Sequence, residues 1–550
     1  MKKVIILLVC LSPWLISGVT LAQDSVDING SDVVPQITFP GITQSDFQHA
    51  FNVLQECVVT RLPVYGFNYP FMYPGGLYDK WWYTVDSIHI LGVNLPSKPY
   101  FEKFWWEIDG SLTLSGAKWA NETFAENVMR DFIAVQRPDG RIPLFALDSL
   151  SLTSKVSALP TLFEVGYSIA RRTNDTALVD SIFHCLKKYL DWWLSYSVRR
   201  DRATGLVTGL FEESLPSNEG QAFTRAPVDL NTEIVMGCRN VARLAKQLGD
   251  IQDYRKYSGL ESEIKRSMNK YMWADSAYYA YNVRKSRIDK TLLCNAFYPL
   301  EDNIASGDRI TKLLRLLTNN RYFNWDQNPV TTAAKTDPAF NETGGVYNGS
   351  QWMGDIWSMK NVAIIQGLED VGRYDLAAYL SYKTVMLFNN NCTEFIVPST
   401  GLGQGQLDYG WSASQYIQVI IERIFGVDYD NFDKTITLMP RLAQPLIGHE
   451  LSLDSLRLPD GDRLNLDISS THQGAVDIKY ALSGIPVNKM RIVIALPANR
   501  GLEYEAADSH DRSLQLSVIH KGLSDIFSIN EGIRNTGQVE FTVRNKTANN

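Results

Sequence analysis

From about residue 45 to about residue 425, apolar residues recur every three or four positions, which is the period of an amphipathic helix. The segments with this pattern come in pairs, and long aromatic or Gly/Pro-rich connections separate them. We expect strong helices over 124–135, 159–171, 178–195, 230–248, 253–273, 310–317, 359–371, 375–387 and 412–424, and weaker ones over 46–58, 84–91 and 291–297. A count close to a dozen paired helices predicts a mainly α fold, a toroid of helical hairpins.

After about Val427 the pattern changes to short, partly alternating apolar runs with turn residues between them. The runs cover 435–438, 451–458, 464–468, 476–480, 490–496 and 539–543, and they predict a small antiparallel β domain. A structural cap on the helical toroid is at least as good an interpretation of this domain as ligand binding. We therefore expect an N-terminal extension packing on the toroid over 23–70, the helical toroid over 71–427 and the β domain over 428–550.

The first 22 residues have the layout of a cleavable secretory signal. Lys2 and Lys3 precede an apolar run, and a small residue, Ala22, closes it. No other stretch approaches the roughly 18 continuous apolar residues of a spanning helix. We expect a periplasmic or secreted protein with no membrane span after cleavage.

Composition and charge exclude other classes of protein. The 550 residues are 45% hydrophobic and 21% charged, which is enough for one large core plus a smaller domain and argues against disorder. The net charge of −7 leaves no basic surface for a phosphate backbone, so nucleic acid is not an expected partner. After signal cleavage, an odd and scattered set of cysteines allows at most two disulfides of open pairing and does not indicate zinc: Cys57, Cys185, Cys238, Cys294 and Cys392. We expect no cofactor.

The candidate chemistry lies in the long connections 205–228, 319–352 and 389–411, because long loops inside a compact domain are usually functional or disordered. In the last of these, Glu394 lies on a loop rich in turn formers, shortly before Trp411 and an expected helix start. The glycines of this loop allow close backbone approach, and an aromatic wall can bind the apolar face of a sugar ring. Glu394 is therefore a candidate catalytic base, and a solvated loop residue or a helix-capping partner is the alternative.

Four segments in a fixed order carry a family resemblance. They are Lys80-Trp81-Trp82-Tyr83-Thr84-Val85-Asp86-Ser87-Ile88-His89, Gln136-Arg137-Pro138-Asp139-Gly140-Arg141-Ile142-Pro143, Tyr347-Asn348-Gly349-Ser350-Gln351-Trp352-Met353-Gly354-Asp355-Ile356-Trp357 and Cys392-Thr393-Glu394-Phe395-Ile396-Val397-Pro398-Ser399-Thr400-Gly401. Over about residues 70–425 the chain resembles the inverting glycosidases on an (α/α)6 barrel. These include the α-glucosidases of glycoside hydrolase family 63, the mannosylglycerate-type hydrolases and, more distantly, the trehalases.

The resemblance implies a sugar-binding role for several of these residues. In the first segment, Asp86 would contact sugar hydroxyls beside Trp82 and His89, and the alternative is a helix cap at Asp86 with buried tryptophans. The second segment is a tight turn that supports the fold only. In the third, we expect Trp352 to be the sugar platform. The other expected subsite residues are Asp355, Trp357 and Trp411.

The same resemblance makes Glu394 the general base and requires a protonated carboxyl about 6.5–9.5 Å away, with room for a water molecule. A gapless comparison places the family's acid on Pro216, which cannot donate a proton. Glu213 ranks first as the donor because Phe211 and Leu215 flank it and can desolvate it. Glu212 and Glu219 are the other candidates. A solvated acidic loop on a barrel that has lost hydrolysis is the alternative.

The next segment also resembles the family. Arg225 would orient a carboxylate there, and Asp229 would cap the following helix.

The sequence thus predicts an exported glycoside hydrolase that cleaves an α-linked glucoside or related hexoside with inversion, acting on an oligosaccharide or glycoside. Two alternatives remain open. One is a carbohydrate-binding pseudo-hydrolase that uses the tryptophans alone. The other is a polysaccharide lyase on a helical toroid, which would need a Tyr or His base rather than two carboxylates.

Overall fold

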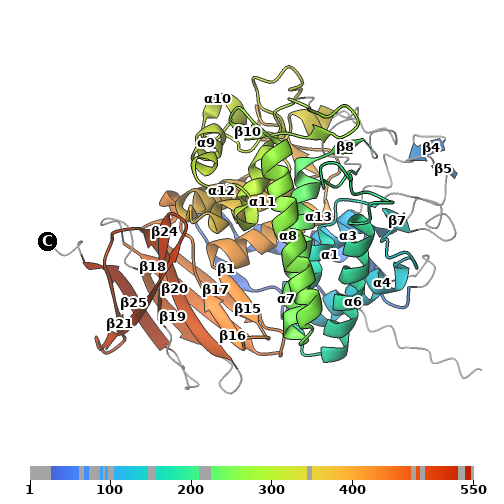
Figure 1. Ribbon diagram of the computed structural model, residues 1–550. Coiled ribbons are helices and arrows are strands. Elements are labelled where there is room, and N and C mark those ends of the chain that lie inside the picture. The colour runs from blue at the N-terminus through green and yellow to red at the C-terminus, as the bar shows by residue number, and fades with distance from the viewer. Residues whose placement is uncertain are drawn as a thin grey trace, which may run out of the picture.

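A computed structural model describes residues 26–60, 67–73, 87–90, 93–96, 105–146, 157–209, 224–342, 350–471, 478–483, 490–529 and 539–546. It is mainly helical, with a separate β region at the C-terminal side (Figure 1). Among the described residues, the helices are too short or too polar for any of them to traverse a lipid bilayer.

Six helical elements contact one another in a closed series. Each contacts the next along the chain, and the last contacts the first. In order they are α3 (Glu107–Ala120), α5 (Leu162–Ala170), α7 (Val228–Gln247), η2 (Cys294–Asn303), α11 (Ser358–Asp370) and α13 (Gly410–Gln418). We call this series the inner ring.

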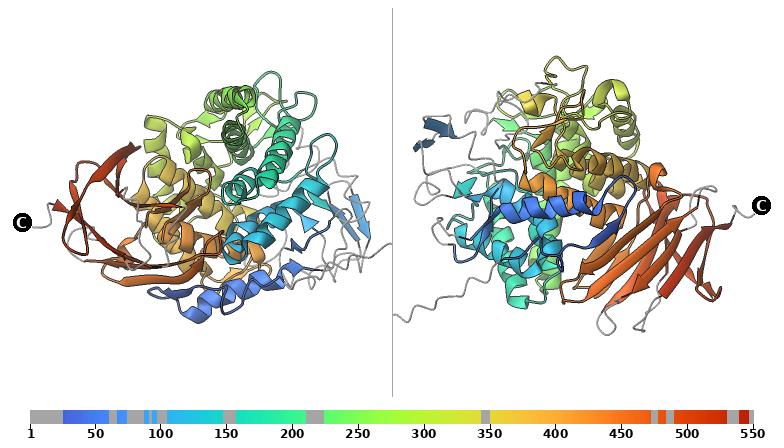
Figure 2. Two further views of the ribbon diagram at one scale, coloured as in Figure 1. Left: turned by 90° about the horizontal axis from the view of Figure 1, so that it is seen from below. Right: turned by 180° about the vertical axis from the view of Figure 1, so that it is seen from behind.

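A second set of helices packs outside the inner ring. Each contacts the inner element that precedes it along the chain, and the first described helix contacts the last inner element (Figure 2). In the order of their inner partners α3, α5, α7, η2, α11 and α13, they are α4 (Glu122–Val135), α6 (Thr176–Trp193), α8 (Ile251–Tyr271), α9 (Asp308–Leu317), α12 (Tyr374–Phe388) and α1 (Gln44–Glu56). The strong predicted helices and the weaker one at 46–58 are confirmed to within a few residues, except that α13 ends at Gln418 and passes into the π-helical turn η4 (Val419–Ile424). The short elements α10 (Asn320–Phe323) and η3 (Ser350–Met353) belong to connections.

Local sequence explains where these helices begin and which of them could be predicted. Thr43 and Asp46 form a reciprocal capping box at the start of α1, and the Asp175 and Asp250 side chains cap α6 and α8. The outer helix α8 buries one face only, so its apolar residues recur every three or four positions in the sequence. All residues of α3 are buried, so it lacks an amphipathic pattern, and the sequence analysis missed it.

Two of the weaker helix predictions are corrected. Within 84–91, residues Ser87–Ile90 form strand β4, which pairs with β5 (Val93–Pro96), because the apolar residues of Ser-Ile-His-Ile alternate with the period of a strand. The helix predicted over 291–297 is present only from Cys294, and it is a 3-10 helix, η2, that contains Pro299. The Pro138-Asp139-Gly140 turn is confirmed, with the Gly140 N–H donating to the Arg137 carbonyl at 2.9 Å and a Gly140 φ of +97°.

The β region consists of two sheets. The first has the order β1-β17-β18-β19-β25-β21-β22, and the second β15-β16-β20-β24-β23. Buried Tyr480 donates from its hydroxyl to the Ala495 carbonyl at 3.0 Å, which joins the two sheets face to face. The strands are β1 (Gln36–Thr38), β15 (Val427–Asp430), β16 (Thr435–Leu438), β17 (Glu450–Arg457), β18 (Arg463–Ser470), β19 (Ile478–Ser483), β20 (Arg491–Asn499), β21 (Tyr504–Asp508), β22 (Ser513–Leu514), β23 (Leu516–Lys521), β24 (Ser524–Ile529) and β25 (Val539–Asn545).

Two details of this region depart from the predicted antiparallel domain. Strands β16 and β20 pair in parallel, which the long connection through β17, β18 and β19 permits. Strand β1, from near the N-terminus, is also part of the first sheet and pairs with β17. Strands β21 to β24 were missed.

Short strands stiffen the connections between the helices. They are β2 (Val58–Val59), β3 (Phe71–Met72), β6 (Trp105–Trp106), β7 (Phe145–Ala146), β8 (Arg225–Ala226), β9 (Trp273–Ala274), β10 (Ala277–Tyr278), β11 (Tyr281–Asn282), β12 (Arg287–Ile288), β13 (Phe395–Ile396) and β14 (Gly403–Gln404).

Candidate active site

Glu394 immediately precedes strand β13, which forms a hairpin with β14. Its side chain is buried, and the Gln406 N–H donates to Glu394 Oε2 at 3.1 Å. The Glu394 N–H in turn donates to the Gln406 carbonyl at 2.9 Å. The hairpin therefore fixes both the backbone and one carboxylate oxygen of this residue, and the alternative of a solvated loop residue does not fit its burial.

Gly405 allows the hairpin to close around this carboxylate. Its φ is +78°, and a Cβ atom at this position would lie 2.7 Å from Glu394 Oε2 and 2.6 Å from Phe395 Cε1. Only glycine has both the backbone conformation and the space.

An aromatic cluster lies beside the hairpin. The ring of Trp357 stacks on Trp352, with centroids 3.5 Å apart, and contacts Phe395 at 5.3 Å and Trp411 at 5.5 Å. Trp411 also meets Tyr409 edge to face at 4.9 Å. Trp352 is 9% exposed and Trp357 is fully buried, so one of the two tryptophans packs inside and the other lies nearer the surface.

Backbone hydrogen bonds join the third and fourth sequence segments. Ile356 and Ile396 exchange two N–H to carbonyl bonds of 2.8 and 2.9 Å. The bridge places Asp355, which is fully buried, and Trp357 directly next to the Glu394 hairpin. Both segments carry predicted site residues, and the fold brings them together.

The structure adds two acidic residues that sequence reasoning missed, at the start of α3. The Tyr409 hydroxyl donates to Asp109 Oδ1 at 2.7 Å, and the Tyr409 N–H bonds to the Cys392 carbonyl, two residues before Glu394. Burial raises the pKa of Asp109 to about 6, against the lowering effect of the Tyr409 hydrogen bond. These contacts place Asp109 on the same side of the inner ring as Glu394.

Glu107 is the second of these acids. It is completely buried, and neither of its carboxylate oxygens has a hydrogen-bond partner among the described residues. Burial, with a further contribution from Asp109, raises its pKa well above the ordinary range. The available sequence signal was the Trp105-Trp106 pair ahead of the two acids, which repeats the Trp-Trp-then-Asp order of Trp81 to Asp86.

Polar side chains also meet at the starts of α7, η2 and α11. The Nζ of Lys360 lies 3.4 Å from Asp229 Oδ2, and both side chains are completely buried. Asn295 donates to the same carboxylate oxygen. Asp229 lies inside the first turn of α7 rather than at its N-cap, which is Pro227, so the predicted capping role is wrong.

Arg225 is buried on β8, and its Nη2 lies 3.4 Å from Asp289 Oδ2. Burial lowers the pKa of its guanidinium, against the raising effect of Asp289 and Asp229. Its carbonyl accepts a 3.2 Å hydrogen bond from the Gly209 N–H. The hydrogen bond between Gly209 and Arg225 thus joins the residues that precede and follow the predicted proton donors in the sequence.

Several predicted site residues lie outside the described residues. These are Trp82, Asp86, Glu212, Glu213 and Glu219; His89 is on β4, and the description there extends to the backbone only. The five described cysteines are buried thiols: Cys57, Cys185, Cys238, Cys294 and Cys392.

A family model for the mannosylglycerate hydrolase MGH1-like glycoside hydrolase domain matches residues 102–412. The chain belongs to this family. The match includes Glu107, Asp109 and Glu394, together with the tryptophans of the aromatic cluster, and it begins after the segment from Lys80 to His89. The resemblance to the family 63 and trehalase-like glycosidases is confirmed.

Relatives of this family member are distant. An uncharacterised protein of Borreliella burgdorferi is 24% identical over 293 residues, which is 49% of this chain and 60% of the relative. A periplasmic trehalase of Escherichia coli is 26% identical over 241 residues, 40% of each protein. The chain thus spans roughly half the length of the curated relatives that it matches.

Among solved structures, a family 63 mannosylglycerate hydrolase from Thermus thermophilus, in complex with Tris and D-glycerate, superposes with a TM-score of 0.52 at 16% identity. The superposition covers 68% of this chain and 99% of that one. At this identity the likeness shows a shared fold.

Proposed function

We propose that the protein is an exported glycoside hydrolase that cleaves an α-linked glucoside or related hexoside with inversion of the anomeric centre. The inner ring and its outer partners then form an (α/α)6 barrel, and the reaction takes place where the inner helices begin. Burial of Glu394 within a rigid hairpin beside the aromatic cluster is the observation that carries the proposal. The family match supports it.

In the proposed reaction Glu394 is the general base that removes a proton from the attacking water. Its hydrogen bond from Gln406 fixes the orientation of the carboxylate. The aromatic cluster, with Trp352 nearest the surface, binds the sugar ring by its apolar face. The roles of Trp82, Asp86, His89, Asp355, Trp357, Trp411 and Arg225 in holding the substrate are part of this proposal.

The proton donor must be a carboxyl group that stays protonated near neutral pH. Glu213, followed by Glu212 and Glu219, is our proposal on sequence grounds. Asp109 and Glu107 are rival candidates on structural grounds, because burial raises the pKa of each and both lie where α3 begins. If a glutamate between residues 212 and 219 is the donor, the Glu107 and Asp109 carboxyls bind sugar hydroxyls instead of protonating the departing oxygen.

Substitution and product analysis test these assignments. Hydrolysis of α-linked disaccharides and aryl glycosides is followed by NMR, which reads the anomer released first. We expect the inverted anomer, loss of turnover in Glu394→Gln, and loss of turnover in either Glu213→Gln or Asp109→Asn. Aryl glycosides with good leaving groups need little proton donation, so the donor variant retains activity on them and the base variant does not.

Other outcomes would assign another function. Sugar binding without product, unchanged by Glu394→Gln, would identify a carbohydrate-binding pseudo-hydrolase. An unsaturated product that absorbs in the ultraviolet would identify a lyase.

A further inference from the structure

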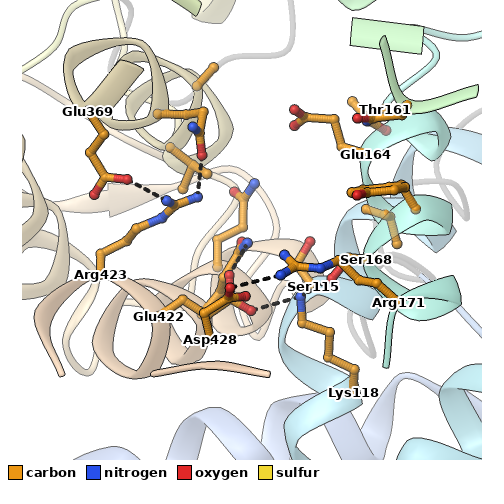
Figure 3. A pocket seen from close by; sticks show the side chains of 18 of the residues that line it. Ser115, Lys118, Thr161, Glu164, Ser168, Arg171, Glu369, Glu422, Arg423 and Asp428 are labelled. Carbon is orange, nitrogen blue, oxygen red and sulfur yellow. Dashed lines mark hydrogen bonds and ion pairs between the residues drawn. The ribbon is translucent and has the colours of Figure 1, made fainter. Parts of the chain in front are cut away.

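A cavity of about 460 Å³ lies between the inner helices and the adjoining β region (Figure 3). Its lining comes from the inner helices and from the adjoining β region. It extends from Met359 at the start of α11 and Glu164 in the first turn of α5 to Lys118 near the end of α3, Glu422 of η4 and Asp428 of β15. Glu394, Asp109 and Lys360 all lie at or before the starts of these helices and do not line it. The cavity is therefore separate from the candidate active site.

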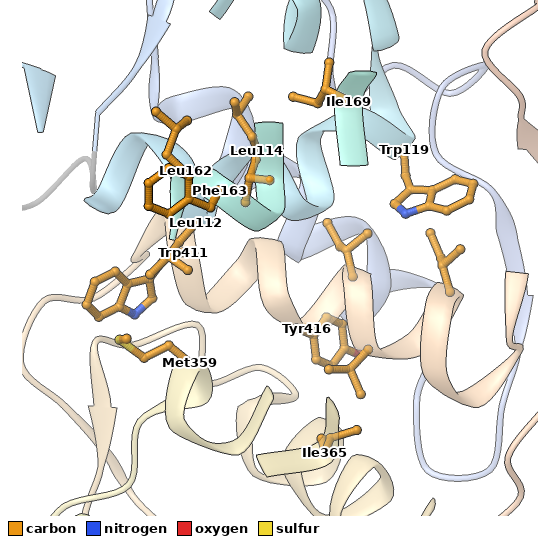
Figure 4. Close-up of a cluster of buried hydrophobic side chains, with 14 of the residues drawn as sticks. Leu112, Leu114, Trp119, Leu162, Phe163, Ile169, Met359, Ile365, Trp411 and Tyr416 are labelled. Carbon is orange, nitrogen blue, oxygen red and sulfur yellow. The ribbon is translucent and has the colours of Figure 1, made fainter. Parts of the chain in front are cut away.

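An apolar layer borders the cavity. Leu112, Leu162, Met359 and Trp411 are buried in one cluster of the inner ring (Figure 4). Leu112 and Met359 also line the cavity. One side of the cavity thus has an apolar surface on which the C–H groups of a small molecule can pack.

Many of the charged groups of the cavity walls are paired with one another. Lys118 Nζ lies 2.7 Å from Glu422 Oε1, and Arg423 Nη1 lies 2.6 Å from Glu369 Oε2. Although burial alone would raise it, the charges of Lys118 and Arg423 lower the pKa of Glu422 to about 2. Arg171 is held by Asp428 at 2.8 Å. These pairs compensate much of the charge of the walls, and the paired groups keep further hydrogen-bonding directions.

Glu164 differs from the other acidic residues of the walls. It projects from α5 toward Glu369 and Arg423 on the opposite wall (Figure 3). Its ion pair with Arg239 is long, at 3.8 Å, and its side chain is 41% exposed although it lies deep in the molecule. The exposed surface of this carboxylate faces the space of the cavity, so its oxygens can accept hydrogen bonds from a ligand.

This combination selects the class of ligand. The Glu164 carboxylate would repel an anionic ligand, and the Arg239 and Arg423 guanidinium groups would repel a cationic one. Because these wall charges are already paired, no free opposite charge offsets the cost of burying an ionic ligand. A neutral molecule with several hydroxyl groups can donate to carboxylates and accept from guanidinium groups at the same time. The volume lies in the usual range of small-molecule sites.

We infer that this cavity is a second, non-catalytic binding site for a neutral polyhydroxylated molecule of about disaccharide size, with Glu164 accepting hydrogen bonds from its hydroxyl groups. The site goes beyond the proposed hydrolysis and does not depend on it. Its ligand contacts the apolar layer with one face and the paired charges with the other.

Calorimetric titration of the full chain with trehalose and with maltose tests the inference. The titrations use the Glu394→Gln protein, so that neither sugar is consumed if Glu394 is the base. We expect at least one of the two sugars to bind in a way that Glu164→Gln weakens about tenfold, the loss of one charge-assisted hydrogen bond. Ala363→Phe, which fills the cavity from α11 without removing a polar group, should abolish this binding.

Matched controls decide between outcomes. Glu503→Gln removes a carboxylate that is 76% exposed in the β region and should leave binding unchanged. Circular dichroism establishes that each variant is folded, and Glu164→Gln, which keeps the side-chain shape, remains informative if Ala363→Phe does not fold.

Binding of neither sugar, or binding that neither cavity variant weakens, would overturn the inference and identify a cavity filled with water only. Full activity in the Glu394→Gln protein would instead overturn the proposed function. That result would leave the cavity variants as an independent test, because they alter no residue of the candidate active site.

Discussion

Two pairs of buried carboxylates, at opposite ends of the inner ring, lie in opposite electrical settings. Where α3 begins, Asp109 accepts a hydrogen bond from the Tyr409 hydroxyl, Glu107 is completely buried, and burial raises the pKa of both. At the other end, Glu422 and Glu369 are in ion pairs with Lys118 and Arg423, and the pKa of Glu422 falls to about 2. The contrast teaches that burial alone does not make a carboxyl reactive, because a nearby cation converts it into a structural charge.

The largest expected effect concerns activity at the first end. Glu394→Gln keeps the size of the side chain and removes its basicity, so kcat should fall by about 10² to 10⁴. The measurement is turnover on the best substrate of an α-glycoside screen. An unchanged kcat would mean that the base is elsewhere and that the contrast between the ends does not concern catalysis.

The second effect concerns stability at the other end. Lys118→Met leaves Glu422 buried without its cation, and we expect the free energy of unfolding to fall by about 3–5 kcal/mol, with little change in kcat. Denaturant unfolding measures the loss. Lys479→Met, which breaks an exposed cross-strand pair with Glu540, is the control and should leave the unfolding midpoint almost unchanged. Equal effects of the two substitutions would show that the buried pair is not structural.

A pH titration should separate the two kinds of carboxyl. The pKa of Asp109 is higher in the folded chain, about 6, than its ordinary value near 3.8, so the folded state binds the extra proton between these values. The free energy of unfolding therefore falls as pH rises from about 4 to about 6, by up to about 3 kcal/mol. Asp109→Asn should remove this part of the slope in thermal unfolding. A slope identical to that of the wild type would place the titration elsewhere.

The smallest effect tests how closely the hairpin holds Glu394. Gly405→Ala should cost about 1–2 kcal/mol of stability, because a Cβ atom would contact Glu394 Oε2 at 2.7 Å and the φ of +78° strains alanine. It should also lower kcat/KM, since the carboxylate shifts. Gly461→Ala has a φ of +87° and no atom within 4 Å of its Cβ, so it shares the strain without the contact. Equal kcat/KM values for the two variants would show that Glu394 tolerates displacement.

Much of the fold could be predicted from sequence because the outer helices bury one face and expose the other. The fully buried helix α3 could not, since it has no polar face to give a period, and its two acidic residues were therefore missed. Ser87–Ile90 was assigned to a helix although its alternation suits a strand. A local pattern also cannot show a contact between distant segments, such as the β1 pairing with β17.

The candidate site divides in the same way. Glu394 and the tryptophans were recognisable because each lies in a segment whose residue order is characteristic on its own. The hydrogen bond from Tyr409 to Asp109 joins residues three hundred positions apart, and only the closed ring brings them together. The proton donors predicted between residues 212 and 219 stay a prediction.

The pairing of β1 with β17 has a consequence for how the protein is made. Gln36 lies opposite Asp454, so a strand synthesised first finds its partner only after most of the polypeptide has left the ribosome. Until then the edge along which the two strands pair is unsatisfied, and chaperones can shield it. Completion of this sheet edge is therefore a late event, and truncation before Glu450 should yield a chain that aggregates rather than a smaller working enzyme.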